Sequence, residues 1–125
     1  MSDVRPFPKS AQLSRGPRRY RRKVASPKQW QAIWEAKRGP CRACSFRAPA
    51  AIDPHHLVWR EDGGDDVADN IVPLCRKCHE ALHVHRAPAI ARLLLTRLSD
   101  AEYAYMVERG GEDYAERVYG IEYAR

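Results

Sequence analysis

The spacing of apolar and polar residues predicts an N-terminal helix that begins just after residue 25. Trp30, Ile33 and Trp34 recur at i, i+3 and i+4, which is the spacing of one helix face. Ser26 opens a capping box with the residue three positions later, and Gly39-Pro40 ends the helical pattern. We expect the two tryptophans on this face to pack in the protein core.

The middle of the chain predicts a β-hairpin followed by a helix. Residues 52–59 are extended in character, and residues 70–74 form a second short apolar run with Pro73 best placed at a strand edge. Between these runs, residues 61–66 are polar and turn-rich, so we expect a loop that is too polar to pack. Helical spacing then covers residues 76–87.

The C-terminal third of the chain predicts three helices. A capping box of Ser99 and Glu102 opens the second of them, and Gly110-Gly111 ends it. A last short helix covers Tyr114–Tyr119. We expect the apolar stripes of these helices to form core against the middle of the chain, and we see no catalytic arrangement in them. The stripes consist of Ile90, Leu93, Leu94 and Leu98 in the first helix, and of Tyr103, Met106 and Val107 in the second.

Length and pattern together indicate one small α+β domain with tails. A chain of 125 residues buries a modest hydrophobic core, and domains of this size often need a bound metal ion to stabilise the fold. We divide the chain into a basic flexible arm at residues 1–25, a core at residues 26–87 and a helical extension at residues 88–125. No apolar run has the length of a transmembrane helix, so we expect no membrane partner.

Positive charge is concentrated near the N-terminal end. Residues 1–40 carry eleven Lys and Arg against two acidic residues, a surplus of +9, whereas the whole chain has a formal charge of +6. Such a surplus indicates a polyanionic partner, of which nucleic acid is the commonest, although basic runs also occur as solvated tails. The basic run, which we expect to contact nucleic acid, contains Arg18, Arg19, Arg21, Arg22 and Lys23.

All four cysteines fall in two C-x-x-C pairs, Cys41 with Cys44 and Cys75 with Cys78. Disulfides would require a secreted protein, but the Met1 end is polar and basic and has no stretch typical of a signal peptide. We therefore expect a reducing cytoplasm, where this spacing predicts a closed shell of four thiolates around a structural Zn²⁺. An iron–sulfur cluster is the alternative, but nothing else in the chain indicates redox chemistry.

Four of the five histidines lie in the segment from Cys41 to His83, and a four-cysteine site does not need them. His79 and His83, at i and i+4, share one helix face, so their imidazoles can bind one ion. His55 and His56 are adjacent in an extended segment, where successive side chains point in opposite directions unless the backbone bends. The pattern predicts one imidazole on a metal and one neutral imidazole that serves as a base.

This segment resembles the HNH endonuclease family, whose core is the ββα-metal motif. The resemblance covers about residues 38–86, and the two cysteine pairs are similar to the zinc knuckles that flank the hairpin in many members. It implies a ββα-metal core clamped by a four-cysteine zinc site, with an N-terminal helix and added C-terminal helices. The matching residues are Asp53-Pro54-His55-His56-Leu57, Gly63-Gly64, Asn70-Ile71-Val72-Pro73-Leu74-Cys75, and Cys78-His79 followed by His83.

The resemblance implies a role for each matching residue. His56 resembles the general base that deprotonates the attacking water. Asn70 resembles the middle residue of the motif, whose amide bonds backbone across the hairpin loop and holds the base in position; in some members this residue is itself a metal ligand. Asp53 is a candidate hydrogen-bond partner for one imidazole. The implied ligands of one catalytic ion are His55, His79 and His83.

The implied activity is metal-dependent hydrolysis of DNA phosphodiester bonds, which leaves a 5′-phosphate and a 3′-hydroxyl. One divalent ion neutralises charge on the scissile phosphate and stabilises the departing oxygen. Three imidazoles suit Zn²⁺, Ni²⁺, Co²⁺ or Mn²⁺ better than Mg²⁺, although members of the family work with Mg²⁺. His85 lies outside the pattern and is expected at the surface. Candidate phosphate contacts beside the motif are Arg60, Arg76 and Lys77.

Other functions stay open from the sequence. A zinc-knuckle module could bind nucleic acid without cleaving it, but the histidines and Asn70 would then be superfluous. A nuclease subunit of a phage packaging or recombination machine could use the C-terminal helices to dock a protein partner. A single ββα-metal site cuts one strand, so a double-strand cut needs a homodimer or two successive nicks. Bacterial and phage-type members work in the cytoplasm of a bacterial or phage-infected cell, which is the location we expect.

Overall fold

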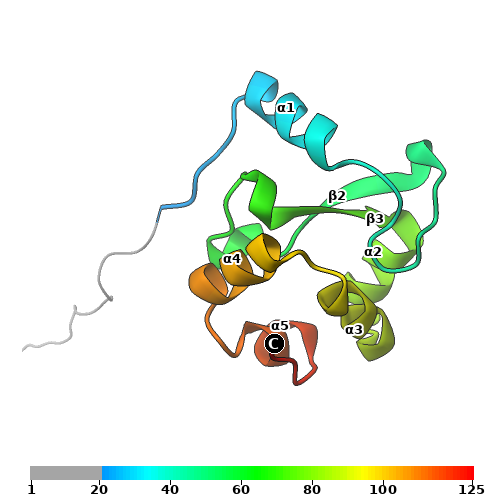
Figure 1. Ribbon diagram of the computed structural model, residues 1–125, viewed down its shortest axis with the longest axis vertical. Helices are drawn as coiled ribbons and strands as arrows, with labels where there is room; N and C mark the ends of the chain where they lie inside the picture. The colour runs from blue at the N-terminus through cyan, green and yellow to red at the C-terminus, as the bar shows by residue number, and fades with distance from the viewer. Residues whose placement is uncertain (1–20) are drawn as a thin grey trace, which may run out of the picture.

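A pair of short antiparallel strands lies at the centre of the computed structural model, which describes residues 21–125 (Figure 1). Strand β2 (Ile52–His56) pairs with strand β3 (Ile71–Cys75). Pro54 lies opposite Pro73, and neither residue has an N–H group to donate to the ladder. The hairpin predicted from the sequence is therefore confirmed.

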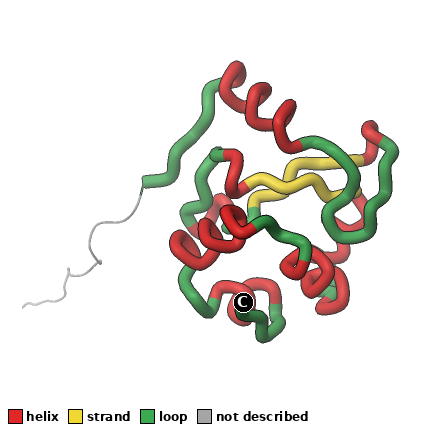
Figure 2. Tube along the Cα trace, in the orientation of Figure 1, coloured by secondary structure: helices red, strands yellow, loops and turns green. Residues whose placement is uncertain are grey.

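Five α-helices surround the two strands in this part of the chain (Figure 2). Helix α2 packs against both strands, α1 lies over β3, and α4 packs against the turn that precedes β3. The expected small α+β class is confirmed. The helices are α1 (Pro27–Lys37), α2 (Arg76–His83), α3 (Pro88–Thr96), α4 (Asp100–Gly110) and α5 (Tyr114–Tyr119), and single 3₁₀ turns cover Pro49–Ala51, Arg60–Asp62 and Ala68–Asn70.

Helix α1 begins at its predicted capping box. The Ser26 hydroxyl accepts a hydrogen bond from the backbone N–H of Gln29, and the Gln29 side chain accepts one from the backbone N–H of Ser26. The expectation that both tryptophans pack in the core is wrong, because no α1 residue is buried. Trp34 packs against the edge of the core, whereas the Trp30 ring stacks on the ring of His56.

Helix α3 differs from its predicted stripe at one position. Leu93 is 38% exposed, because the helix buries Ala91, Leu94 and Leu95 against its neighbours. A run of consecutive apolar residues fits two adjacent faces of a helix equally well, so the spacing alone did not select the buried face.

Helix α4 begins at the second predicted capping box, in which Ser99 and Glu102 exchange side chain–backbone hydrogen bonds. Of the three residues expected to face inward, Met106 is fully buried, while Tyr103 and Val107 are partly exposed. The capping box is a local pattern of backbone and side chain, and it was correctly predicted at both helices where it occurs.

Glu102 also clamps three parts of the chain together. Its carboxylate lies 2.6 Å from the Lys37 ammonium at the end of α1 and 2.6 Å from the Arg42 guanidinium beside the first cysteine pair. Burial acts to raise the pKa of Glu102, but the hydrogen bonds from Arg42 and Lys37 outweigh it and lower the pKa to about 2. The carboxylate is therefore ionised throughout the neutral range.

The hairpin and the C-terminal helices share one hydrophobic core. The strands contribute Val72 and Leu74, and the segment after β2 contributes Leu57 and Val58, all without exposed area. Helices α3, α4 and α5 cover this layer, and together with the end of the chain they contribute Leu94, Leu95, Met106, Tyr114, Tyr119 and Ile121. The residues of the C-terminal extension thus belong to the same core as the hairpin, whose strand β2 carries His55 and His56.

The loop between the strands packs tightly, contrary to the expectation that it is too polar to do so. A methyl group on Gly64 would lie 1.7 Å from the carbonyl oxygen of Val58, so only glycine fits there. Asp65 is 2% exposed and is hydrogen-bonded by the Tyr105 hydroxyl at 2.7 Å and by the backbone N–H of Lys23 at 2.7 Å. Polar residues can pack when each buried group finds a partner.

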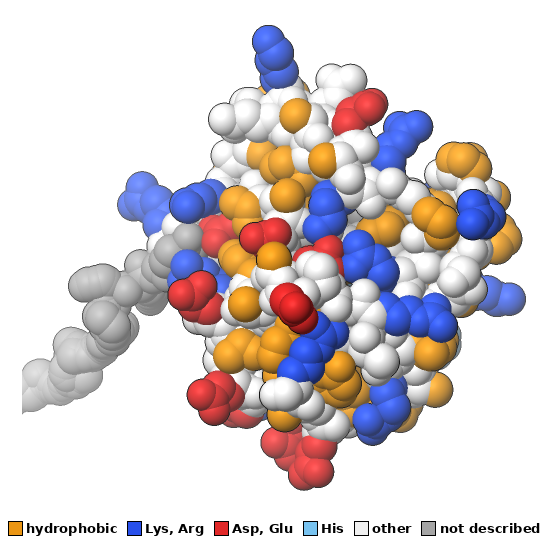
Figure 3. Space-filling model, viewed as in Figure 1, with side chains coloured by type: hydrophobic (Ala, Val, Ile, Leu, Met, Phe, Trp, Pro, Cys, Tyr) orange, Lys and Arg blue, Asp and Glu red, His pale blue; other side chains and the backbone are white. Residues whose placement is uncertain are grey.

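Charged side chains of both signs are spread over the face seen in Figure 3, and acidic side chains gather over its lower end. Among residues 21–125, no helix has both the length and the apolar character that crossing a membrane requires.

Candidate functional site

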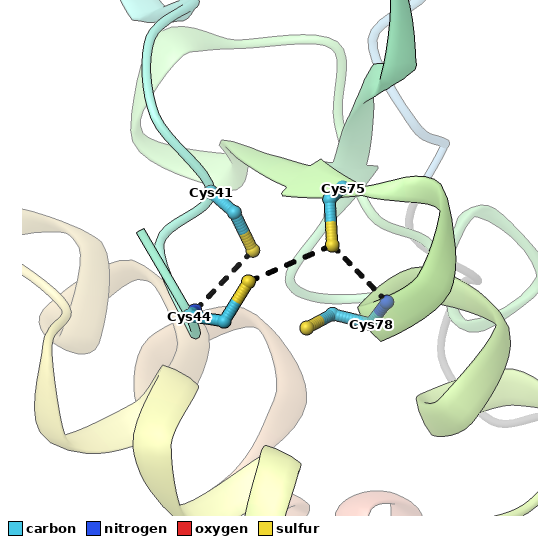
Figure 4. Close-up of side chains that lie close together, drawn as sticks. All are labelled: Cys41, Cys44, Cys75 and Cys78. Atoms are coloured by element: carbon cyan, nitrogen blue, oxygen red, sulfur yellow. Dashed lines mark hydrogen bonds between the residues drawn. The ribbon is translucent and has the colours of Figure 1, made fainter. Parts of the chain in front are cut away.

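The four cysteines converge on one point (Figure 4). The first pair lies on the loop after α1, and the second spans the junction where β3 ends and α2 begins. The Sγ atoms of Cys44 and Cys75 are 3.7 Å apart. Two sulfurs bound to one tetrahedral Zn²⁺ at about 2.3 Å lie about 3.8 Å apart. The distance between these two sulfurs therefore fits two ligands of one tetrahedral ion.

Backbone groups favour the thiolate form of Cys41, whereas burial raises the pKa values of Cys44 and Cys78. The backbone N–H of Cys44 donates to the sulfur of Cys41, and that of Cys78 donates to the sulfur of Cys75, both at 3.4 Å. Burial acts to raise the pKa of Cys41, but hydrogen bonds from backbone N–H groups outweigh it and lower the pKa to about 7. Thiolates are the form that binds metal ions.

Three histidines form a second group with the geometry of a metal site. His55, at the end of β2, and His79 and His83, one turn apart on α2, each place a nitrogen within 4.8 Å of the others. Nδ1 of His55 and Nε2 of His83 are 3.4 Å apart. Two nitrogens bound to one tetrahedral ion at about 2.1 Å lie about 3.4 Å apart. The pKa values of all three imidazoles are lowered, chiefly by burial, so they are neutral and able to bind a metal at neutral pH.

His55 is held by a residue from the far end of the chain. It is 1% exposed, and its Nε2 lies 2.8 Å from the hydroxyl of Tyr119 on α5. The same hydroxyl donates a hydrogen bond of 2.7 Å to the carbonyl oxygen of Leu57. The nitrogen of His55 that faces His83 is therefore Nδ1, while Nε2 faces α5.

His56 lies in the same pocket as the three histidines. The pocket has a volume of about 200 Å³ and is open to solvent on one side. Successive residues of a strand normally face opposite sides, but β2 ends at His56, and both His55 and His56 line the pocket. A fourth imidazole thus stands beside the group that can hold a metal. The remaining lining residues are Pro54, Trp59, Arg60 and Glu61.

A carboxylate and an aromatic ring fix the orientation of His56. Its Nε2 lies 2.8 Å from the carboxylate of Asp66, and the Trp30 ring stacks on it with a centroid distance of 5.7 Å and an interplanar angle of 8°. Asp66 is also paired with Arg22 and accepts a hydrogen bond from the backbone N–H of Ala25. Burial lowers the pKa of His56 although Asp66 acts to raise it, so the ring is neutral at neutral pH.

Asn70 ties the loop between the strands to the residues after β2. Its Oδ1 accepts a hydrogen bond from the backbone N–H of Val58, and its Nδ2 donates to the carbonyl oxygens of Val58 and Asp65. The residue has no exposed area. Both polar atoms of the amide are thus engaged in hydrogen bonds to backbone.

Asp53 lies near the histidine group without a hydrogen bond to it. Its carboxylate is 3.9 Å from Nδ1 of His79 and makes its closer ion pair, at 3.0 Å, with Arg76. Asp53 therefore acts on His79 through its charge, which raises the pKa of the imidazole, against the larger effect of burial.

The basic residues expected to contact nucleic acid have different surroundings. Arg18 and Arg19 lie outside the described residues. Arg21, Lys23, Arg60 and Lys77 are exposed, and Arg60 lines the histidine pocket. Arg22 is engaged by Asp66 and by the carbonyl oxygen of Gly64, and Arg76 by Asp53.

Sequence reasoning missed four residues that shape this site: Asp66, Tyr119, Trp30 and Trp59. Asp66 looked like part of a solvated turn, and Tyr119 and Trp30 looked like core. Trp59 packs on His83 with ring centroids 4.5 Å apart. No short motif contains these residues, because each meets its histidine from a different part of the chain.

Comparisons with known proteins agree with the geometry. Residues 41–85 match the family model described as HNH endonuclease, which confirms the resemblance found from the motifs. The chain is also 35% identical over 63 residues to the type IV methyl-directed restriction enzyme EcoKMcrA of Escherichia coli (strain K12). That alignment covers 45% of this chain and 22% of the length of the restriction enzyme.

Proposed function

We propose that this chain is a metal-dependent nuclease that hydrolyses phosphodiester bonds of DNA, because residues 41–85 match the HNH endonuclease family. One observation carries the proposal. His56 shares a pocket with three histidines spaced for a metal ion, yet it is outside both groups of metal-binding side chains. An imidazole beside a metal site, held by a carboxylate, has the surroundings that a general base needs.

The two groups of metal-binding side chains have different tasks in this proposal. The four thiols hold a structural Zn²⁺ that joins the loop after α1 to the junction of β3 and α2, and a closed shell leaves no position for a substrate. His55, His79 and His83 would hold one divalent ion in the pocket that they line. When bound, that ion neutralises charge on the scissile phosphate and stabilises the departing 3′ oxygen.

His56 takes the proton from the attacking water. The ionised Asp66 can only accept, so Nε2 of His56 carries the hydrogen and Nδ1 keeps its lone pair for the water. When Nδ1 receives the proton, the ring becomes positively charged, and the adjacent carboxylate stabilises that charge. Asp66 has the same role as the buried carboxylate of a catalytic triad, which fixes the tautomer of the histidine and stabilises its protonated form.

Asn70 supports this geometry from outside the pocket. Its three hydrogen bonds to backbone fix the segment that follows His56 and the loop that carries Asp66. We propose that it positions the base and its carboxylate relative to each other and does not bind the ion.

Exposed cations supply contacts to phosphates. Arg60 lines the pocket, and Lys77 lies on the first turn of the helix that carries His79 and His83. The basic run near the N-terminus adds affinity that does not depend on sequence. The alignment with the restriction enzyme covers only 22% of its length, so we do not extend its methyl-directed recognition to this chain.

The proposal is tested by relaxation of a supercoiled plasmid. The full-length protein, supplied in turn with Mg²⁺, Mn²⁺, Ni²⁺, Co²⁺ or Zn²⁺, should convert the plasmid to open circles with at least one of these ions, and EDTA should prevent it. A gel-shift assay on the same samples separates cleavage from binding. Binding without cleavage under every ion would support the non-catalytic zinc-knuckle module and contradict the nuclease.

A further inference from the structure

Three tyrosines from the C-terminal helices place their hydroxyl groups on the segment that follows β2. In each case the hydroxyl has two partners, one on either side. Tyr105 and Tyr114 each accept a hydrogen bond from a backbone N–H, of Asp65 and Trp59 respectively, and each donates to a carboxylate. Tyr119 is the only one of the three whose hydroxyl touches a histidine of the pocket.

The proton positions around Tyr119 follow from its two partners. The carbonyl oxygen of Leu57, at 2.7 Å, can only accept, so the hydroxyl hydrogen points to it. A tyrosine hydroxyl has an ordinary pKa of about 10, so it keeps that hydrogen at neutral pH. Toward Nε2 of His55, at 2.8 Å, the hydroxyl oxygen therefore accepts, and Nε2 must donate.

This assignment selects one tautomer of His55. With the hydrogen on Nε2, the lone pair of the neutral ring is on Nδ1. Nδ1 is also the atom that lies 3.4 Å from Nε2 of His83, at the spacing of two ligands of one ion. Both the His55 and the Tyr119 side chains are buried, so the ring cannot turn over without moving α5.

We propose that Tyr119 is a positioning residue for the histidine metal site: from α5, it fixes the tautomer and the ring orientation in which His55 binds the ion. The metal affinity of the site then depends on the docking of α5, which lies outside the HNH segment at residues 41–85. This inference rests on the proposed function, because it assigns His55, His79 and His83 to one ion. Residues that hold a metal-binding histidine through its second nitrogen commonly change metal affinity by roughly 10–100-fold.

If Tyr119 had only a structural role, its substitution should change the metal affinity no more than substitution of Tyr105 on α4 does. The Tyr105 hydroxyl also accepts one hydrogen bond and donates another, but its partner is Asp65 and it does not contact a histidine. Tyr119→Phe and Tyr105→Phe therefore remove the same group from the same helical extension, and they differ in the contact with His55.

Calorimetric titration of Ni²⁺ into full-length protein with its cysteine site loaded with Zn²⁺ tests the inference. We expect Tyr119→Phe to bind Ni²⁺ roughly 10–100-fold more weakly than the wild type, and Tyr105→Phe to match the wild type within about twofold. Circular dichroism and melting curves verify that both variants fold. Equal affinity of Tyr119→Phe and wild type would overturn the inference, and so would equal weakening by both substitutions.

A second measurement needs no variant at all. Long-range ¹⁵N–¹H spectra of the histidine rings report which nitrogen carries the hydrogen in the metal-free wild type. The Nε2–H tautomer of His55 is expected, and an Nδ1–H tautomer would overturn the inference even if Tyr119→Phe failed to fold.

Failure of the inference and failure of the proposed function give different results. If the wild type relaxes plasmids in a metal-dependent way while Tyr119→Phe binds Ni²⁺ normally, the inference alone fails. If the wild type binds Ni²⁺, loses it in His79→Ala and weakens in Tyr119→Phe, but relaxes no plasmid under any ion, the nuclease proposal fails and the inference stands. Absence of Ni²⁺ binding by the wild type would overturn the inference.

Discussion

The carboxylate of Asp66 accepts a hydrogen bond of 2.8 Å from Nε2 of His56. Burial acts to raise the pKa of Asp66, but the hydrogen bonds from His56 and from the backbone N–H of Ala25, together with the charge of Arg22, lower it. The carboxylate therefore stays ionised and leaves Nδ1 of His56 free to accept a proton. The loop between the strands, which looked like a solvated turn, provides the group that orients the imidazole.

Asp66→Asn should slow DNA cleavage, because a neutral amide neither fixes the tautomer of His56 nor stabilises its protonated form. We expect the single-turnover rate at saturating metal to fall roughly 10–100-fold or more. Asp69→Asn, an exposed change in the same region, is the control and should cleave at the wild-type rate. Equal rates in both variants would mean that Asp66 does not orient the base.

The same substitution should move the pH profile of cleavage. Asp66 raises the pKa of His56 through its hydrogen bond and its charge, against the larger effect of burial. Without the carboxylate the pKa falls further, so the ring loses its proton at lower pH. The acid limb of the rate profile should therefore shift to lower pH in Asp66→Asn, while its plateau is reduced. A shift toward higher pH would contradict this electrostatic account.

Gly64→Ala should destabilise the loop that carries Asp65 and Asp66. The added methyl group would lie 1.7 Å from the carbonyl oxygen of Val58 and 2.9 Å from Nδ2 of Asn70, so backbone must move. We expect a loss of about 2 kcal/mol or more in the free energy of unfolding, measured by urea denaturation. Gly39→Ala is the matched control, because a methyl group there meets nothing within 4 Å. Similar stability of the two variants would show that the loop tolerates a side chain.

Glu102→Gln should cost on the order of 2 kcal/mol of stability at neutral pH, because it leaves Arg42 and Lys37 without their buried partner. The pKa of Glu102 is lowered to about 2 in the folded chain, so the carboxylate stabilises the fold above its ordinary pKa near 4.5. That stabilisation is lost as the pH falls from about 4.5 toward 2. Urea denaturation at pH 7 and pH 4, with the exposed Glu108→Gln as control, should show the difference from wild type narrowing at the lower pH.

Cys75→Ser should release the metal of the cysteine site and unfold the domain, because Cys75 joins β3 to α2 and lies 3.7 Å from Cys44. Metal analysis and a melting curve measure both effects. His79→Ala removes a proposed ligand of the other site only, so it should keep the cysteine-bound metal and the wild-type melting temperature. An unchanged metal content in Cys75→Ser would contradict the assignment of the four cysteines to one ion.

Features that depend on neighbouring residues were predicted well from the sequence. The capping boxes at Ser26 and Ser99 involve groups three positions apart, and both form as expected. The two metal-binding groups were found because each C-x-x-C pair and the His79–His83 pair have spacings that local backbone geometry imposes. The predicted hairpin lies between the two C-x-x-C pairs, so its antiparallel strands were expected to bring the two pairs close together.

Contacts between distant segments could not be predicted in this way. Tyr119 lies 64 positions from His55 along the chain, and an inward-facing tyrosine in a helix has the same spacing whether its hydroxyl contacts a histidine or only backbone. The Trp30 ring was expected in the core for the same reason, but it stacks on His56. The spacing of apolar residues indicates which face of a helix is buried. It does not indicate which side chain from another segment that face will contact in the folded protein.

We propose that His56 acts as the base beside an ion bound by the three other histidines of the pocket. The most direct test measures single-turnover cleavage of a labelled duplex, at saturating metal, by the wild type, by His56→Ala and by His85→Ala, in which an exposed histidine outside the pocket is removed. Nickel affinity is measured on the same samples. The account predicts that His56→Ala binds metal as the wild type does but cleaves roughly 10²–10⁴-fold more slowly, while His85→Ala is unchanged. Cleavage by His56→Ala at the wild-type rate, with metal bound, would contradict it.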